Sequence, residues 1–307
     1  MTDVSVIVIS FNTRDLLHAC LASVTRCHAA EVIVVDNGSS DGSVAMVQRE
    51  YPAVRLIASA QNLGFVRANN LALRQATGMH LLLLNPDAEL LPGALEELQD
   101  FLDAHERAAI VGPQLQYPDG SLQHAAFRFP TLLQTYFEFF PHPARLLASG
   151  LNGRYPTASY RGSPFQADFV LGACLLARRE AVEHVGLLDE SYFMYCEEMD
   201  WCWRFRRAGW SVWCDPRARV VHHEAQSSRQ TRWESYVEKW RSRRRFYARY
   251  YPAWWQATNR LIIRVGLWAE ERRARLAHQR GEISPDELAG RLAAYERVAK
   301  IMAQPVA

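Results

Sequence analysis

The first half of the chain alternates between short apolar runs and segments with helical spacing. Val4–Ile9 is an uninterrupted apolar run, as expected for a strand buried on both faces. Asp15–Thr25 then has apolar residues on one helical face. The two patterns repeat along the chain. The apolar runs predict strands at Glu31–Val35, Val54–Ala58, His80–Leu84 and Ile110–Val111. The helical spacing predicts helices at Phe65–Ala76 and from Pro92, since proline is tolerated in the first turn of a helix. This alternation predicts an α/β fold with a largely parallel sheet and right-handed crossovers.

The second half of the chain has a weaker pattern. Residues 114–165 are rich in proline, glycine and aromatic residues, which predicts loops and short helices. Phe169–Ala177 is again an apolar stretch, and Glu197–Ala208 has helical spacing. Two short strands are predicted at Trp210–Cys214 and Arg219–Val221. From Thr231 onward the spacing is helical, with breaks at Pro252 and at Ser284-Pro285. We therefore expect an α/β domain over residues 1–228, with halves 1–113 and 114–228, and a helical tail over 229–307.

Composition narrows the class of protein. No apolar run in the 307 residues reaches the ~20 needed to span a bilayer. The N-terminus enters a strand pattern at once, without the basic and apolar regions of a signal peptide. The 6 cysteines are scattered and form no Cys-x-x-Cys pair, so we expect buried, reduced thiols. These features predict a cytoplasmic protein, either free or peripheral on the inner face of the plasma membrane.

Charge is divided unevenly along the chain, although the net charge is only +2. Residues 226–307 hold 17 basic residues against 8 acidic ones, whereas residues 1–225 hold 18 against 25. The segment Arg241–Trp255 mixes cations with aromatic rings, and further apolar residues follow at Ile262, Ile263, Val265, Leu267 and Trp268. This pattern suits either an anionic membrane surface or a homodimer through the C-terminal helices. Little supports a nucleic acid partner.

Three polar clusters stand where predicted strands end, at Ser10-Phe11-Asn12, Asp36-Asn37-Gly38 and Asn85-Pro86-Asp87. In an open α/β sheet, ligands bind beyond the carboxyl ends of the strands, so these clusters are expected to converge on one edge. Asp87 suits a divalent cation whose shell is completed by phosphates and water, and it equally suits a turn or a helix cap. Asp36 suits hydrogen bonds from a base or ribose, or an Asx-turn.

Two further segments carry candidate chemistry. Gln61–Phe65 leads into a helix, where Gly64 permits close backbone approach and exposed amides favour a phosphate; an ordinary helix start is the alternative. Glu197-Glu198-Met199-Asp200 places three carboxylates within four residues, between large aromatic side chains. Clustered carboxylates raise one another's pKa, which suits a general base, although acids at a helix start also complement its dipole. Helical spacing places Glu197 and Asp200 on one face and points Glu198 elsewhere.

Two histidines end the last predicted strand, at His222-His223. Strand alternation points one imidazole inward and the other outward. A neutral imidazole could complete a metal shell begun by Asp87, and nitrogen is tolerated better by manganese than by magnesium. Taken singly, each histidine also fits a structural role.

These segments together resemble the inverting family 2 glycosyltransferases, which have the GT-A fold, and within them rhamnosyltransferase-like enzymes of bacterial surface polysaccharide synthesis. The matching segments occur in family order over roughly three quarters of the chain: VSVIVISFN at 4–12, EVIVVDNGSSDGS at 31–43, NLGFVRANN at 62–70, LLLLNPDAEL at 81–90, the run from FVLGACLL to FRRAGW at 169–210, and VVHHEAQSS at 220–228.

The resemblance implies a role for each candidate residue. A nucleotide's base and ribose would be surrounded by Ser10, Phe11, Asn12, Asp36 and Asn37, and the pocket would be shaped by Asn62, Gly64 and Asn70. Asp87 matches the last aspartate of the family's Asp-x-Asp metal motif, Asn85 replaces the first, and His222 matches the histidine that closes the metal site. Mg²⁺ or Mn²⁺ would be the cofactor.

The acidic segment departs from the family pattern. Many relatives carry Glu-Asp-x-Asp, so Glu198 stands at the position of the usual catalytic aspartate, and Glu197 and Asp200 remain further candidates. The implied reaction is a single displacement that moves a sugar from a nucleoside-diphosphate sugar, dTDP-rhamnose or a UDP-sugar, to a glycan or lipid-linked glycan. Two alternatives stay open. A sugar-1-phosphate nucleotidylyltransferase would want a Gly-rich basic signature after the first strand, and a non-catalytic nucleotide-sugar-binding scaffold would bind without turnover.

Overall fold

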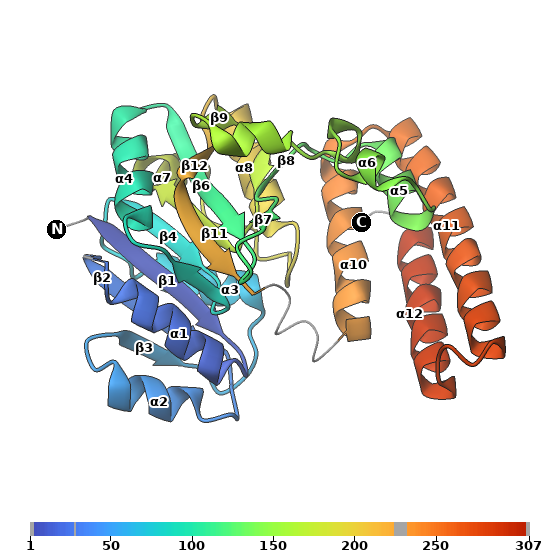
Figure 1. The fold of residues 1–307 in the computed structure, drawn as a ribbon, viewed down its shortest axis with the longest axis horizontal. Coiled ribbons are helices and arrows are strands. Elements are labelled where there is room, and N and C mark those ends of the chain that lie inside the picture. Colours follow the sequence, from blue (N-terminus) through green and yellow to red (C-terminus); the bar gives the residue numbers. More distant parts are fainter. Residues whose placement is uncertain (1–2, 28, 224–231, 305–307) are drawn as a thin grey trace. The chain divides into compact units, whose positions relative to one another are not determined.

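The computed structural model describes residues 3–27, 29–223 and 232–304. Contacts divide the chain into two compact units (Figure 1). The sheet unit comprises Met1–Arg128, Tyr155–Phe193 and Glu197–Ser227, and the helical unit comprises Phe129–Arg154, Met194–Cys196 and Ser228–Ala307. Residues 129–154 therefore pack with the C-terminal helices, a long-range grouping that local periodicity does not reveal.

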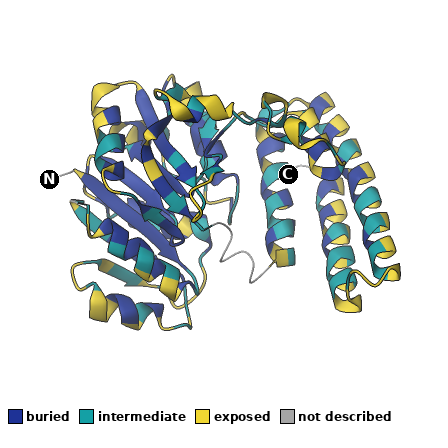
Figure 2. Ribbon diagram, in the orientation of Figure 1, coloured by how far each residue is buried: buried dark blue, intermediate teal, exposed yellow. Residues whose placement is uncertain are grey.

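The first half of the sheet follows the predicted pattern. Four strands pair in the order β3-β2-β1-β4 and run parallel: β1 (Val4–Ser10), β2 (Glu31–Asp36), β3 (Arg55–Ala58) and β4 (His80–Leu84). Every residue of β1 and β4 is buried, because helices cover both faces of the sheet; the central strands are dark blue in Figure 2. The register places Ser10 beside Asp36 and Val8 beside Leu84, so these strands end at one edge.

The second half of the sheet is mixed. It continues from β4 in the order β11-β6-β12-β5, with β6 (Ala108–Gln116), β11 (Cys174–Arg178), β12 (Ser211–His222) and β5 (Ala88–Leu90). Strand β12 is parallel to β6, whereas β11 and β5 are antiparallel to their neighbours. The two short strands predicted at 210–214 and 219–221 are one strand, β12, whose register with β6 shifts between Asp215 and Arg219. Proline interrupts a ladder without ending the strand when a bulge absorbs it.

Four short strands complete the sheet unit: β7 (Leu122–Gln123) on β6, β9 (Phe165–Gln166) on β12, and the pair β8 (Ala126–Phe127) and β10 (Phe169–Val170). Its helices are α1 (Arg14–Val24), α2 (Ser43–Glu50), α3 (Phe65–Leu73), α4 (Ala94–Ala104), α7 (Arg179–Val185), α8 (Glu197–Arg207) and the 3-10 turn η2 (Thr157–Arg161). The prediction that Pro92 lies in the first turn of a helix was wrong. Helix α4 begins at Ala94 because Gly93 takes the cap with a left-handed φ of 81°.

The helical unit contains α5 (Leu132–Phe139), α6 (Ala144–Leu147), the 3-10 turn η1 (Gly150–Asn152), α10 (Arg232–Tyr250), α11 (Ala253–Gln279) and α12 (Pro285–Ala303). Both predicted helix breaks are present: Pro252 caps α11, and the Ser284 hydroxyl caps α12 by accepting the Glu287 N–H, with Pro285 in the first turn.

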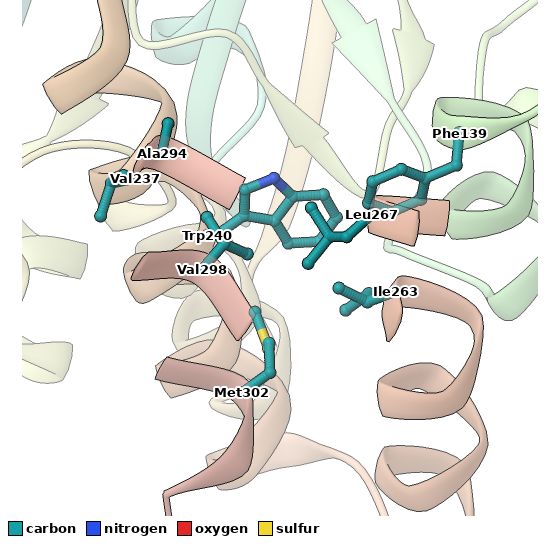
Figure 3. Close-up of a cluster of buried hydrophobic side chains, with 8 residues drawn as sticks. All are labelled: Phe139, Val237, Trp240, Ile263, Leu267, Ala294, Val298 and Met302. Atoms are coloured by element: carbon teal, nitrogen blue, oxygen red, sulfur yellow. The ribbon is translucent and has the colours of Figure 1, made fainter. Parts of the chain in front are cut away.

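A buried apolar cluster holds these helices together (Figure 3). Trp240 of α10 is fully buried and stacks on Phe139 of α5, with ring centroids 5.2 Å apart. Helices α11 and α12 complete the cluster with Ile263, Leu267, Ala294, Val298 and Met302. Among the described residues, no helix is long and apolar enough to cross a bilayer. All six cysteines are free thiols, as the sequence predicts, and five of them are buried.

Candidate functional site

The ends of β1 and β2 are joined into one polar edge. The Asn37 N–H donates to the Ser10 carbonyl at 2.8 Å. The Asn12 N–H donates to Ser39 Oγ, and Asn12 Oδ1 accepts from the Ser40 N–H, both at 2.9 Å. Asn12 has a left-handed φ of 50°, and Phe11 lies half-buried beside it. The first two predicted clusters therefore converge.

Asp36 presents an unsatisfied oxygen at this edge. Its Oδ1 accepts the N–H groups of Gly38 and Ser39, as an Asx-turn does. Its Oδ2 is buried and has no hydrogen-bond partner among the described residues. A buried acceptor left unpaired costs about 1–3 kcal/mol, so a ligand that donates to Oδ2 would recover this energy.

Asn37 and Asn62 fasten the next loop to the end of β2. The Asn37 amide donates to Asn62 Oδ1 at 3.0 Å and to the Gly64 carbonyl at 3.3 Å, and it accepts from the Leu63 N–H. Asn62 Oδ1 also accepts the Gly64 N–H at 2.9 Å. These bonds hold the loop rigidly ahead of α3.

Gly64 permits a close approach by the segment that precedes α8. A Cβ on Gly64 would lie 2.5 Å from the Phe193 ring, and the Phe65 N–H donates to the Phe193 carbonyl at 2.9 Å. Asn70, further along α3, is buried and donates to the Leu188 carbonyl and to Glu190 Oε1. Both residues thus link α3 to the chain ahead of α8.

Asp87 and His222 form a buried pair. Asp87 lies just beyond β4, and His222 ends β12. Asp87 Oδ1 lies 3.4 Å from His222 Nε2, and both side chains are less than a tenth exposed. The His223 N–H donates to the Asp87 carbonyl at 2.9 Å, and the Asn85 N–H donates to Ala173, so backbone bonds fix the turn that carries Asp87. His223 instead contacts Glu89, at 2.9 Å.

Gln123 determines which tautomer of His222 is present. Gln123 Oε1 lies 2.9 Å from His222 Nδ1 and can only accept, so Nδ1 carries the proton. In the neutral ring the Nε2 lone pair then faces the Asp87 carboxylate. Two electron-rich atoms repel each other, so this arrangement is favourable only when a cation or a proton lies between them. Such an outer hydrogen bond is the usual companion of a metal-binding histidine.

The donor set fits a divalent cation that keeps most of its shell for a ligand. The described residues contain no group of three or more His, Cys, Asp or Glu side chains arranged for a metal. Asp87 and His222 alone would leave positions for phosphate oxygens and water, as octahedral cations prefer. One oxygen and one nitrogen suit manganese better than magnesium.

A strained turn introduces the acidic segment. Tyr195 and Cys196 have φ angles of 69° and 65°, and α8 begins immediately after them at Glu197. Each left-handed non-glycine residue costs roughly 1–2 kcal/mol, and such strain concentrates at functional sites. The turn sets the direction in which the first carboxylates of α8 project.

Glu197 and Glu198 behave as a pair. Burial raises the pKa of Glu197, and the neighbouring Glu198 raises it further. Burial also raises the pKa of Glu198, whose Cβ, Cγ and Cδ pack beside Gly172. In each residue Oε2 is buried without a hydrogen-bond partner among the described residues. A carboxylate with a raised pKa is matched to proton transfer near neutral pH.

Asp200 has a different environment. Its side chain is fully buried, and its Oδ2 lies 2.8 Å from Arg204 Nε. Arg204 in turn donates to the carbonyls of Val185 and Leu187. The carboxylate that shares a helical face with Glu197 therefore anchors the segment between α7 and α8, and the two glutamates are the pair that interact.

A surface cavity of about 430 Å³ lies at the opposite end of β12, where the strand begins. It is lined by Tyr155, Asp168, Arg206, Trp210 and neighbouring residues, and it includes none of the predicted site residues. Sequence reasoning missed Gln123, because a single glutamine in a two-residue strand has no local signal. It also missed the left-handed pair Tyr195-Cys196, since neither residue type indicates that conformation.

Known proteins are similar to this chain over most of its length. The model of the family described as glycosyl transferase family 2 matches residues 5–186. An N-acetylglucosaminyl-diphospho-decaprenol L-rhamnosyltransferase of Mycobacterium tuberculosis is 31% identical over 87% of this chain and 91% of its own length. The O-antigen biosynthesis protein RfbC of Myxococcus xanthus is 30% identical over 73% of this chain, which spans 17% of that protein. A mannosyltransferase of Pyrobaculum calidifontis, solved with GDP-Man and Mn²⁺, superposes with a TM-score of 0.60 at 17% identity, covering 98% of this chain and 84% of that one.

Proposed function

This chain belongs to glycosyl transferase family 2, with a GT-A fold and C-terminal helices, and from that premise we propose a metal-dependent, inverting transfer of a sugar from a nucleoside-diphosphate donor to a hydroxyl group. The observation that carries the proposal is the Asp87–His222 pair oriented by Gln123. It lies at the end of β4, next to the strand whose end meets Asp36. A cation site on the same edge of the sheet as the unsatisfied Asp36 oxygen suits a ligand with a diphosphate at one end and hydrogen-bond donors at the other.

The donor we favour is dTDP-rhamnose, with UDP-sugars as the next class to test. The Mycobacterium relative is named as a rhamnosyltransferase, and its name describes an acceptor in which a sugar is linked through diphosphate to a polyprenol. We therefore propose a glycan or lipid-linked glycan acceptor for this chain, with the reaction on the cytoplasmic side. Asp36 Oδ2 would accept a hydrogen bond from the base or ribose, and this buried oxygen would then have a partner.

The chemical step that we propose begins at Glu198. Its carboxylate removes the proton of the acceptor hydroxyl, and that oxygen attacks the anomeric carbon from the face opposite the diphosphate. The carbon–oxygen bond to the diphosphate breaks with its electron pair, and the configuration inverts. Burial and the neighbouring Glu198 raise the pKa of Glu197, which favours its protonated form, and a protonated Glu197 would donate a hydrogen bond to Glu198 and keep that carboxylate oriented. A divalent cation on Asp87 and His222 would supply a Lewis acid for the leaving diphosphate.

The test is a transfer assay with Mn²⁺ and a panel of sugar nucleotides, read by mass spectrometry, with NMR of the product's anomeric proton. We expect one nucleotide sugar to be consumed and the product to be inverted. Glu198→Gln should retain donor binding and lose at least about a hundredfold in turnover, since a positioned base contributes that much or more. Glu106→Gln is the matched control, because Glu106 is exposed and lies outside the site.

Several outcomes would contradict the proposal. Nucleotide transfer to a sugar phosphate would instead identify a nucleotidylyltransferase. Donor binding without turnover across the panel would indicate a non-catalytic binding protein. Turnover by Glu198→Gln equal to that of Glu106→Gln would remove Glu198 as the base, with Glu197→Gln and Asp200→Asn as the next variants to assay. Asp87→Ala that bound donor and Mn²⁺ unchanged would exclude the metal assignment.

A further inference from the structure

Helix α11 exposes a row of large apolar side chains, called here the stripe. Trp254, Leu261, Val265, Trp268 and Leu276 are between 45% and 65% exposed, which is unusual for large apolar side chains. At 100° per residue these five positions fall within an arc of about 80°, and they extend over roughly 33 Å of helix. The core residues of α11, among them Ile263 and Leu267, lie on the opposite side. The stripe is therefore one face of α11 and not scattered exposure.

This exposed face corrects the sequence interpretation of the tail. Within Arg241–Trp255, the aromatic residues Phe246, Tyr247 and Trp255 are buried in the helical unit. Of the apolar residues predicted to add surface beyond it, Ile263 and Leu267 are buried, and only Val265 and Trp268 are large exposed side chains. Among the described residues from 232 to 304, the large exposed apolar side chains thus lie on α11, beginning at Trp254.

Positive charge accompanies the stripe. The exposed positions of α11 include four arginines, Arg260, Arg264, Arg272 and Arg275, and no aspartate or glutamate. The guanidinium of Arg272 lies 4.9 Å above the Trp268 ring. The two glutamates of the helix are only partly exposed, and each forms an ion pair on the helix itself, Glu270 with Arg273 and Glu271 with Arg275. At 100° per residue Arg272 falls at the centre of the same arc, between Trp268 and Leu276, and Arg264 and Arg275 flank the arc on one side.

We propose that this face of α11 lies in the interface of an anionic lipid bilayer, with the stripe among the upper acyl chains and the arginines among the headgroups. Interfacial helices combine an apolar face with basic flanks, and tryptophan favours this depth. A closed symmetric dimer through the same face would oppose like surfaces, placing arginine against arginine, and exposed α11 positions offer no acid to pair with them. The inference deepens the proposed function, because it rests on a lipid-linked acceptor as the reason for such a face.

The experiment is sedimentation of the full chain with vesicles of phosphatidylcholine alone, or with about one third phosphatidylglycerol, at low and high salt. We expect binding to the anionic vesicles that weakens with salt, because headgroup attraction is screened. Trp254→Ser with Trp268→Ser should weaken binding about tenfold or more, and Arg260→Gln with Arg264→Gln should remove the preference for anionic lipid. Met79→Ser with Leu151→Ser is the matched control, since both side chains are equally exposed elsewhere.

Equal vesicle binding by the stripe variant and the control would overturn the proposal. A second result would also overturn it. If light scattering showed that the wild-type chain is a dimer and the stripe variant a monomer, the face would bind a second copy of the chain and not a bilayer. Circular dichroism of each variant checks the fold, which exposed positions should not perturb. Transfer to a water-soluble acceptor separates the two proposals: if wild-type chain binds vesicles without transferring sugar, the proposed function fails and the membrane face stands.

Discussion

Replacing Gly64 with alanine tests how tightly the loop before α3 is packed against the segment before α8. Gly64 has φ 81° and ψ 168°, a conformation that is essentially restricted to glycine. A Cβ there would lie 2.5 Å from Phe193 Cδ2 and 2.9 Å from the Phe193 carbonyl oxygen. The Phe193 ring is half exposed and can move, but its carbonyl is held by the Phe65 N–H. The substitution must therefore displace backbone.

The expected cost has two parts. The backbone conformation costs a side chain about 1–3 kcal/mol, and overpacking against a fixed neighbour adds about 1–3 kcal/mol. Gly64→Ala should therefore lower the free energy of unfolding by about 2–6 kcal/mol. Gly93 provides a control without the close contact, because its added Cβ would meet nothing within 4 Å; its φ is also 81°, but its ψ of −5° lies in the left-handed helical region. Gly93→Ala should cost only about 1–2 kcal/mol.

Urea unfolding followed by tryptophan fluorescence measures both variants, with the midpoint compared at constant slope. Adding Phe193→Ala to Gly64→Ala should recover the part of the loss that comes from the ring and leave the part from the carbonyl oxygen. Transfer activity should also fall in Gly64→Ala, because Phe193 leads directly into the turn that positions Glu197 and Glu198. If Gly64→Ala were no more destabilising than Gly93→Ala, the close packing derived from the structure would be incorrect.

Three further predictions concern buried polar groups. Gln123→Leu should weaken Mn²⁺ binding about 10–100-fold, because it removes the hydrogen bond that orients His222. A calorimetric titration with Mn²⁺ in the absence of donor measures this affinity, and an unchanged affinity would contradict the prediction. In the helical unit, burial alone would raise the pKa of Glu138, but two neighbouring cations hold that pKa at about 2. These ion pairs should contribute about 3 kcal/mol to the free energy of unfolding at neutral pH, and this contribution is lost as pH falls from 4.5 to 2. Glu138→Gln should abolish this pH dependence in denaturant titrations. The raised pKa of Glu197 has the opposite effect on stability. The free energy of unfolding falls as pH rises above 4.5, the pKa of this carboxyl in the unfolded chain. Glu197→Gln should therefore weaken this dependence of stability on pH and raise the urea midpoint at neutral pH.

Much of the sheet was predictable because a buried strand needs apolar residues on both faces. The run His80–Leu84 matches β4 residue for residue, and Glu31–Val35 lies within β2. Strand β12 was divided in two by the prediction, because Asp215-Pro216 reads locally as a stop. Pairing with β6 carries the strand through that point, which no local signal shows.

The candidate site was predictable where strand ends define it. Asp36 and Asp87 follow buried strands, and the topology of a parallel sheet brings such ends to one edge. The partner of each group was not predictable: Gln123 and His222 are 99 residues apart, and Asn70 holds Leu188 across 118 residues. Asp200 is different: its partner Arg204 lies four residues along the same helix, a spacing that is present in the sequence.

The amino-acid sequence by itself determined the strands of the first half, the polar residues at their ends and the uneven charge of the tail, because each depends on residues close together along the chain. Only the tertiary structure decided which oxygen of Asp36 is left unpaired, which nitrogen of His222 carries the proton, and that Trp254 is exposed while Trp255 is buried. These outcomes depend on neighbours brought from distant segments, and burial then sets the energy of each polar group.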